Sequence, residues 1–339
     1  MDFDLPGGKY VVAVSGGVDS VVLLHALLEK QRKTQLQEAK NPWIEKTTKN
    51  KKHLAGTTVS ASSSSQNNLM GRTHYEFVVA HFDHGIRPDS AEDRRFVEAM
   101  SKHYRLPFIY DNGSLGASAS EEAARNARYN FLHKVRNSLN ADGIITAHHQ
   151  DDAVETILLN LIRGTNNRGL HSLKSTPEVI RPFLHLSKSK VLNYAKLHQL
   201  SWREDASNKD VRYLRNHIRQ NLAPKFGATR RGQILRHGRK AAELQVEIDN
   251  LVAKYLSCQP APKELDRRQF TMLTHDVSKE VLASWLRSHT GVELNSKMLE
   301  RLVASCKTAR SGTKFDVAGG WIIKISLDTI KLVKTELIK

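Results

Sequence analysis

The residues with the clearest chemistry lie near the start of the chain, in the run Ser15-Gly16-Gly17-Val18-Asp19-Ser20. Apolar and mostly β-branched residues, Val11–Val14, lead into this run and predict a buried strand. The paired glycines allow a tight turn, and apolar residues then recur at helical spacing. A helix N-terminus behind a glycine loop offers free N–H groups and a positive dipole to an anion. Asp19 adds a carboxylate that can hold Mg²⁺ against phosphate. The run therefore predicts a phosphate site, although it is not a Walker loop, which would read G-x-x-x-x-G-K-S/T.

Carboxylates cluster where the fourth predicted strand meets its helix. Asp152 and Glu155 stand three residues apart, and Asp151 stands four before Glu155, so these side chains share the first helical turns. Such a cluster can hold Mg²⁺ or an ammonium group. Two alternatives stay open, namely Asp residues acting as helix N-caps, and His148 with His149 acting as metal ligands.

Arginine pairs at helical spacing indicate binding of phosphate. Arg125 and Arg128 stand three residues apart on one predicted helical face, although pairing with nearby glutamates would also explain them. Arg215 and Arg219 stand four residues apart, with Asn216 beside them, and suit the phosphates of a nucleic acid. A solvated basic helix is the alternative for this second pair.

The composition favours a polyanionic partner. The 339 residues carry a formal net charge of +17, and residues 201–240 hold eleven Lys and Arg against three Asp and Glu. Cys258 and Cys306 are far apart, which indicates neither a disulfide framework nor a C-x-x-C site. The first residues lack an apolar signal core, and no apolar run approaches the roughly 20 residues of a membrane helix. We therefore expect a cytoplasmic protein that does not contact a membrane.

Strands and helices alternate up to about residue 200, which predicts an α/β fold with a doubly wound, mostly parallel sheet. Ligands of such sheets bind outside the carboxyl ends of the strands, and the polar groups described above all fall there. The expected strands are Lys9–Val14, Glu76–Asp83, Pro107–Asp111, Gly143–His148 and Val179–Phe183. The expected helices are Ser20–Gln31, Ser90–Tyr104, Ser118–Leu139, Asp151–Arg163 and Ser187–Leu200.

The length suggests about two domains. We expect an N-terminal catalytic domain over 1–220, a long helical linker over 221–262 and a small C-terminal α/β domain over 263–339. Residues 31–74 interrupt the alternation, because they are rich in Lys, Thr, Ser and Asn and hold eight Lys and Arg against two acidic residues. This composition predicts a flexible insertion.

Taken together, these motifs resemble the tRNA(Ile)-lysidine synthetases, a family of pyrophosphate-loop ATPases. The resemblance covers about residues 9–225 apart from the insertion, and it implies a fold like that of the adenine nucleotide alpha hydrolases. Residues 164–170 depart from the glycine-richer loop usual in the family. Five motifs occur in the family's order, and a shorter sixth element joins them: Ser15–Ser20, His81–Arg87, Glu121–Tyr129, His148–Glu155 and Glu204–Arg219, with Arg181–Leu184.

The resemblance implies a two-step reaction. ATP adenylates the C2 oxygen of the wobble cytidine in an isoleucine tRNA with a CAU anticodon, and pyrophosphate leaves. The ε-amine of free L-lysine then displaces AMP, which gives lysidine and changes decoding from AUG to AUA. The C-terminal domain and the basic surface at 201–240 are expected to bind the tRNA.

Each motif then has an expected role. Asp19 should hold Mg²⁺, while Asp152 and Glu155 should bind the lysine and ease its loss of a proton, helped by His148 or His149. The loop residues Ser15, Gly16, Gly17, Val18 and Ser20 should hold pyrophosphate, and adenine should lie near His81 and Asp83. Arg125 and Arg128 are further catalytic candidates, and Arg181, Asn208, Arg215, Asn216 and Arg219 are candidates for substrate binding.

Alternatives of two kinds stay open. Another pyrophosphate-loop enzyme, such as a tRNA cytidine thiolase or an amidotransferase-type synthetase, would need clustered cysteines or a glutaminase domain, and neither is evident. A non-catalytic RNA-binding protein on a degenerate fold would lack Asp19 or the carboxylates of 151–155, and all are present. The oligomeric state is open, with a homodimer among the expectations.

Overall fold

The computed structural model describes residues 1, 3–39, 74–85, 90–113, 115–116, 120–164, 170, 173–204, 214–292 and 294–335. The chain forms two compact units, Met1–Gly238 and Arg239–Lys339. The predicted domain boundaries at 220 and 262 fall on either side of this division and stay a prediction. Among the helices that the structure describes, none is both long and apolar enough to span a bilayer.

The first unit is built on a five-stranded sheet in which all neighbouring strands are parallel. The strand order is β3-β2-β1-β4-β5, so the chain moves outward from β1 to β3 and then returns to the other side of β1. This order confirms the predicted doubly wound α/β fold. The strands are β1 (Gly8–Ala13), β2 (Tyr75–Asp83), β3 (Phe108–Asn112), β4 (Gly143–Ile145) and β5 (Val179–Ile180).

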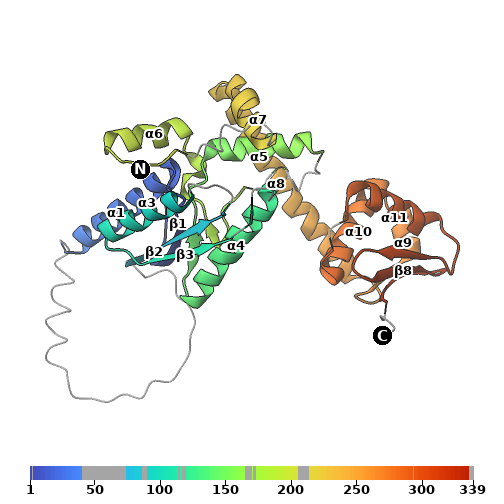
Figure 1. The fold of residues 1–339 in the computed structure, drawn as a ribbon. Coiled ribbons are helices and arrows are strands. Elements are labelled where there is room, and N and C mark those ends of the chain that lie inside the picture. Colours follow the sequence, from blue (N-terminus) through green and yellow to red (C-terminus); the bar gives the residue numbers. More distant parts are fainter. Residues whose placement is uncertain are drawn as a thin grey trace, which may run out of the picture. The chain divides into compact units, whose positions relative to one another are not determined.

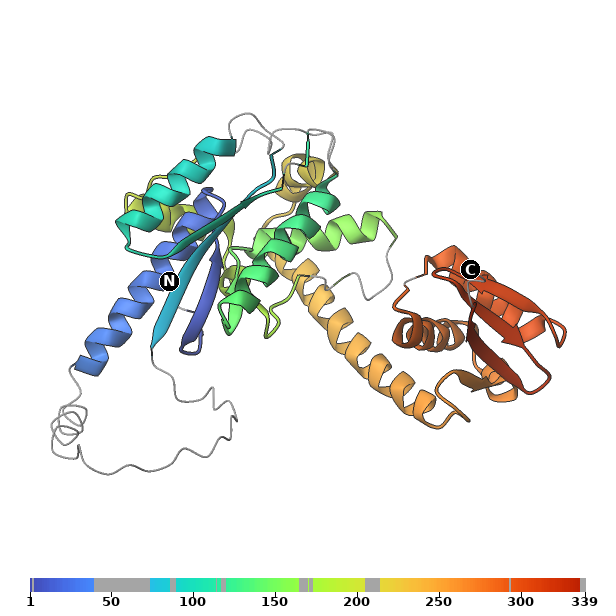
Figure 2. The ribbon, with the colours of Figure 1, turned by 60° about the horizontal axis from the view of Figure 1, so that its bottom comes forward.

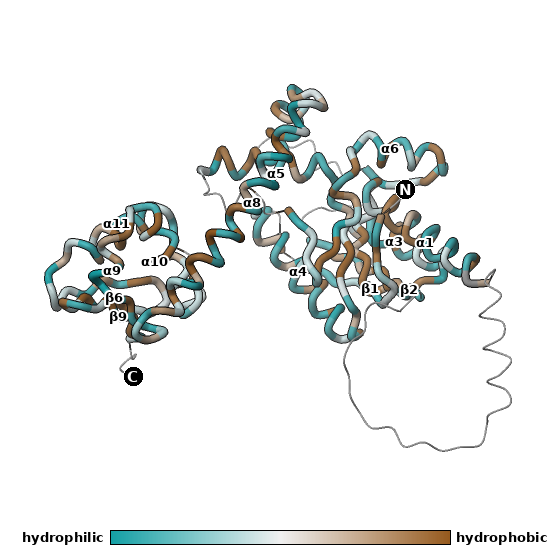
Figure 3. The backbone as a smooth tube through the Cα atoms, turned by 180° about the vertical axis from the view of Figure 1, so that it is seen from behind, coloured by the Kyte–Doolittle hydropathy of each residue, from teal (hydrophilic) through white to brown (hydrophobic). Residues whose placement is uncertain are grey.

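Helices cover both faces of this sheet, as two views of the ribbon show (Figure 1, Figure 2). Helices α1 (Val18–Ala39), α3 (Ser90–His103) and α6 (Lys188–Leu197) pack on one face. Helix α4 (Glu121–Ser138) packs on the opposite face, against alternate residues of β1 and β2. A parallel sheet covered on both faces needs apolar strands, and the tube is brown along β1 and β2 (Figure 3).

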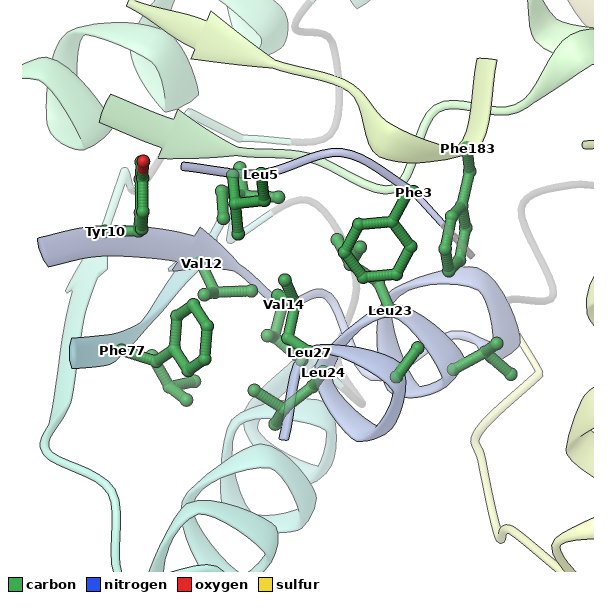
Figure 4. Packing of buried hydrophobic residues seen from close by; sticks show 14 of the residues in the cluster. Phe3, Leu5, Tyr10, Val12, Val14, Leu23, Leu24, Leu27, Phe77 and Phe183 are labelled. Carbon is green, nitrogen blue, oxygen red and sulfur yellow. The ribbon is translucent and has the colours of Figure 1, made fainter. Parts of the chain in front are cut away.

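The side chains of α1 form the centre of the larger core. Leu23, Leu24 and Leu27 are fully buried and belong to one apolar cluster with Val12 of β1 and Val14, which follows that strand (Figure 4). Their spacing places them on one face of the helix. The glycine loop between β1 and α1 is thereby held between two buried elements.

The elements differ from the predictions mainly at their ends. Helix α1 continues past Gln31 to Ala39, because the residues there are mostly good helix formers such as Gln, Lys, Glu and Ala. The expected insertion over 31–74 therefore starts as helix, and its residues 40–73 lie outside the described part of the chain. Strand β5 ends before Pro182, which lacks an N–H donor and begins a 3₁₀ turn, Pro182–His185.

The remaining elements of the first unit follow strands β4 and β5. Helix α5 (Gln150–Ile162) follows β4, while α7 (Leu214–His217) runs into a π-helical turn, Ile218–Leu222, and a 3₁₀ turn, Ala223–Lys225. Helix α8 (Ala228–Ser257) starts in this unit and ends in the second.

The second unit pairs three helices with an antiparallel sheet of order β6-β9-β8-β7. Its core is centred on Trp285, whose indole N–H donates to the carbonyl of Pro262 at 2.9 Å. These elements agree with the expected small α/β domain at the C-terminal end of the sequence, in which β6 and α9 are too short to show a period. The elements are β6 (Glu264–Asp266), α9 (Arg267–Met272), α10 (His275–Thr290), α11 (Ser296–Thr308), β7 (Lys314–Val317), β8 (Trp321–Ile325) and β9 (Thr329–Lys334).

Packing of α1 on β1 should dominate the stability of the first unit. We expect Leu24→Ala to lower the free energy of unfolding by about 2–5 kcal/mol, since it leaves a cavity in a closed core. Leu197→Ala, at a side chain that is 78% exposed, should change it by less than about 0.5 kcal/mol. Urea denaturation followed by circular dichroism measures both, and equal effects would show that α1 is not part of the core.

Candidate active site

A cavity of about 910 Å³ lies at the carboxyl edge of the five-stranded sheet. The segments after β1, β2 and β4 all contribute to its wall, as expected for ligand sites in this type of sheet. Of the predicted site residues, the cavity is lined by Ser15, Gly17, Val18, Asp19, Ser20, His81, Asp83, Arg128, His148, Asp152, Glu155 and Arg219.

The glycine loop has the geometry of an anion site. Gly16 has a φ of +93°, a left-handed conformation that favours glycine. The Ser20 hydroxyl accepts from the Ser15 N–H at 3.2 Å and donates to the Gly17 carbonyl at 2.9 Å, so it closes the loop on itself. The first helical bond of α1 runs from Val21 to Gly17 at 3.1 Å. The N–H groups of the preceding turn have no partner within the helix and can serve a ligand.

Asp19 contacts a cation that the sequence analysis missed. The ammonium of Lys188 lies 2.7 and 2.6 Å from the two carboxylate oxygens of Asp19. His149 Nε2 lies 3.7 Å from the same carboxylate. Lys188 is the first residue of α6, where a cation opposes the helix dipole. That unfavourable position, at the start of a predicted helix, is the signal that could have identified it.

His81 and Asp83 are buried at the end of β2 and hold the loops around them. His81 Nδ1 lies 2.8 Å from the carbonyl oxygen of Val14, which ties the end of β2 to the end of β1. Burial lowers the pKa of His81. Asp83 accepts a bond from the N–H of Gly85 at 2.8 Å. Both residues line the cavity, at the place where adenine was expected.

The start of α5 is organised by a capping box. The His149 side chain accepts from the N–H of Asp152 at 3.3 Å, and the Asp152 carboxylate accepts from the N–H of His149 at 2.9 Å. Burial would raise the pKa of Asp152, but the nearby His149 and His148 and this N–H lower it. The N-cap is His149, and Asp152 is the third residue of the helix, so the alternative that Asp residues act as the N-cap is wrong. The second carboxylate oxygen of Asp152 accepts a hydrogen bond from Arg219.

His148 is held as a neutral imidazole. Burial lowers its pKa to about 3, opposed by Asp152 and helped by the positive charge of Arg128. Its Nδ1 lies 2.8 Å from the Thr146 hydroxyl. A neutral imidazole in the cavity can accept a hydrogen bond or a proton, and it does not repel a cationic substrate.

Glu155 is buried and forms a bidentate ion pair with Arg219. Two nitrogens of Arg219 donate to the two oxygens of Glu155, each at 2.8 Å, and a third contact reaches Asp152 at 3.2 Å. Burial would lower the pKa of Arg219, but the bonds and charge of Glu155 raise it. Arg219 lies on the π-helical turn, an irregularity that often marks functional sites. The carboxylates expected to bind lysine thus contact an arginine expected to bind phosphate.

A second positive group lies around Tyr129. The guanidinium groups of Arg125 and Arg128 lie 5.0 and 5.5 Å from the ring centre of Tyr129, and Arg181 donates to its hydroxyl at 3.2 Å. Desolvation lowers the pKa of Arg128, and the charges of Arg125, Arg215 and Arg181 lower it further. Because neighbouring cations destabilise one another, this group is suited to an anion. Of its arginines, Arg128 reaches the cavity wall.

Other predicted residues lie away from the cavity wall. Arg215 donates to Glu121 at 3.2 Å and to the Thr156 hydroxyl at 2.9 Å, and Arg181 also donates to the carbonyl of Lys174. Gly16, Arg125 and Asn216 do not line the cavity, and Asn208 lies outside the described residues.

Asp151, a member of the predicted carboxylate cluster, contacts Arg231, which the sequence analysis missed. Asp151 accepts from the backbone N–H of Lys188 at 2.7 Å and from the guanidinium of Arg231. One carboxylate therefore joins the starts of α5, α6 and α8. A link between residues so distant in the chain leaves no pattern in the sequence.

The described residues offer a single-carboxylate site for Mg²⁺ rather than a closed protein cage. Within the described part of the chain, no group of three or more His, Cys, Asp or Glu side chains is placed to hold a metal. Asp19 beside the glycine loop fits a cation that is bound mainly by phosphate oxygens and water, which is the usual mode for Mg²⁺.

A glycine loop at a parallel strand end, a helix N-terminus behind it and carboxylates around one cavity define an α/β protein that binds a polyphosphate ligand. The chain belongs to the PP-loop family, because the family model described as a PP-loop domain matches residues 3–226. This membership supports the use of ATP. It does not by itself define the second substrate.

Two curated relatives are similar to this chain over most of its length. The chain is 33% identical over 259 residues to the tRNA(Ile)-lysidine synthase of Geobacter sulfurreducens, which covers 74% of this chain and 46% of that protein. It is 30% identical over 307 residues to the tRNA(Ile)-lysidine synthase of Bacillus subtilis, with 87% and 52% covered. The chain therefore spans about half the length of these relatives. Among solved structures it matches the U34-tRNA thiolase NcsA from Methanococcus maripaludis with a TM-score of 0.46 and 16% identity, over 71% of this chain and 73% of that one.

The neutral state of His148 should make stability depend on pH. Below about pH 6.5 the imidazole binds a proton in the unfolded chain but not in the fold, so stability falls as the pH falls toward 3. We expect His148→Gln to lose less stability than the natural protein between about pH 6.5 and pH 4. Urea denaturation across this range measures the difference, with His185→Gln at an exposed position as the control. Parallel curves for all three proteins would show that His148 titrates normally.

Proposed function

We propose that this protein forms lysidine, by ATP-dependent ligation of free lysine to the wobble cytidine of an isoleucine tRNA with a CAU anticodon. The proposal depends on one observation: a site suited to anions and a site suited to cations line the same cavity. The phosphate-binding loop and the buried pair Asp152 and Glu155 both line it. An amine that must attack an adenylated base needs such neighbouring sites, and the name of the relatives, tRNA(Ile)-lysidine synthase, supports an isoleucine tRNA as the substrate.

The loop side of the cavity would hold the nucleotide. The N–H groups at the start of α1 and the hydroxyls of Ser15 and Ser20 would bind the pyrophosphate part of ATP. Asp19 would hold Mg²⁺, which stabilises the negative charge that grows on the leaving pyrophosphate. Arg128, which lines the same cavity, would contact the phosphate next to the reacting base, and the region of His81 and Asp83 would bind adenine.

The acidic side of the cavity would hold lysine. The guanidinium of Arg219 contacts both Glu155 and Asp152, which supports a preference of these two carboxylates for organic cations. The ammonium of lysine would compete with Arg219 for these oxygens. A carboxylate beside the ε-amine can accept its proton before the amine attacks C2, and the neutral His148 adds no repulsive charge.

The proposed reaction is tested by incorporation of radiolabelled lysine into a CAU-anticodon isoleucine tRNA transcript with ATP and Mg²⁺. We expect label in this tRNA and none in the elongator methionine tRNA. Glu155→Gln should raise the KM for lysine by about tenfold or more, because a charged hydrogen bond is lost, while tRNA-dependent exchange of pyrophosphate into ATP continues. ATP cleavage without lysine incorporation would overturn the proposed nucleophile and keep the family assignment.

The proposed tRNA contact lies in the basic segment 201–240. In its described part, Arg230 and Arg236 are exposed on the first turns of α8. Replacing both by Gln should weaken binding of any tRNA to a similar extent and reduce the slope of log K against log salt by about 1–2. Filter binding at several salt concentrations measures the slope. Glu243→Gln, an exposed acidic position, should not reduce it, and an unchanged slope in the double variant would place the tRNA elsewhere.

A further inference from the structure

Lys188 combines an accessible position with a fixed backbone. Its side chain is 36% exposed and that of Asp19 is 30% exposed, so solvent and ligands can reach the pair they form. The Lys188 N–H is held at 2.7 Å by Asp151, which is in turn bound to Arg231. The start of α6 is thus fixed at the cavity while the ammonium at the end of a flexible side chain is free to change partner.

The partner of Lys188 is the carboxylate that a divalent cation would need. Asp19 belongs to the same helical turn whose N–H groups face the glycine loop, so both oxygens now bonded to Lys188 lie beside the phosphate site. An ammonium and Mg²⁺ compete for one carboxylate. When the cation arrives with phosphate, the ammonium loses Asp19 and gains phosphate oxygens at the same place, so no charge is left unpaired.

We infer that Lys188 is a phosphate-binding residue, which pairs with Asp19 in this structure and transfers to the pyrophosphate part of the nucleotide when a divalent cation binds Asp19. The inference rests on the proposed function in so far as the ligand is ATP. Its ligand class, a polyphosphate with a divalent cation, can be tested without tRNA or lysine.

Two ligands should respond to Lys188→Gln with opposite signs. Mn²⁺ alone, detected by its electron paramagnetic resonance signal, should bind severalfold more tightly, because its competitor for Asp19 is gone. Pyrophosphate with Mg²⁺, measured by calorimetry, should bind about tenfold or more weakly, because a charged donor is gone. A merely structural contact between α6 and α1 would not produce this pair of changes, since loosening the site would weaken both ligands.

Two control variants test whether the effect depends on the positive charge at position 188 or on any lysine of α6. Lys190→Gln removes an exposed lysine from the same helix and should change neither affinity. Lys188→Arg keeps the cation and should bind pyrophosphate within about threefold of the natural protein. The natural protein gives an independent reading, because pyrophosphate with Mg²⁺ should change the rate at which an acylating reagent modifies Lys188, as mapped by mass spectrometry, and should leave Lys190 unaffected.

The outcomes distinguish this inference from the proposed function. The role of Lys188 would be wrong if Lys188→Gln and the natural protein bound pyrophosphate with equal affinity. It would also be wrong if pyrophosphate did not change the acylation rate of Lys188. Neither result would contradict the proposed ATP site. Failure of the natural protein to bind pyrophosphate would overturn both. Opposite shifts for Mn²⁺ and pyrophosphate, with Lys190→Gln unchanged, would establish the exchange.

Discussion

Four carboxylates at the carboxyl edge of the parallel sheet are each matched by a cation from a later part of the chain. Asp19 contacts Lys188, Asp151 contacts Arg231, and Glu155 with Asp152 contacts Arg219. A charged group in a half-buried cavity is costly unless it is paired, so these carboxylates need their partners for the fold to be stable. The partners come from α6, α7 with its π turn, and α8. The charge balance of the cavity therefore fixes where these elements lie against the sheet.

This arrangement connects binding to local structure. A ligand that enters the cavity meets carboxylates that already have partners, so it gains affinity only by replacing an internal ion pair with a better one. A phosphate with its metal ion can do so at Asp19, because it supplies a cation for the carboxylate and an anion for the released ammonium. An ammonium group alone can replace Arg219 at Glu155 only if Arg219 then contacts another anion. The nucleotide and the lysine are thus expected to favour each other's binding, since the first supplies phosphate charge to cations that the second releases.

Much of the fold could be predicted from local pattern, and much of the site could not. The strand, loop and helix around Ser15–Ser20 each have a short-range signal, and so do the apolar strands and the capping residues at the start of α5. The bonds from Arg219 to Glu155 join residues that are 64 apart in sequence, and those from Lys188 to Asp19 join residues 169 apart. Such contacts depend on the order of the strands, which brings the ends of β1, β4 and β5 side by side. Helical spacing places Arg215 and Arg219 on neighbouring turns, but it cannot show that they contact acidic residues.

Glu155 and Asp152 both contact Arg219, because a carboxylate in this cavity is costly without a cationic partner. If Arg219 were absent, Glu155 would be buried with an unpaired charge, which is costly. Arg219 therefore stabilises the carboxylate that the proposed reaction needs, and it also competes with the substrate for that carboxylate. The turn that carries Arg219 is π-helical, a form that is frequent at functional sites, and the exchange of partners that the proposed function requires would take place there.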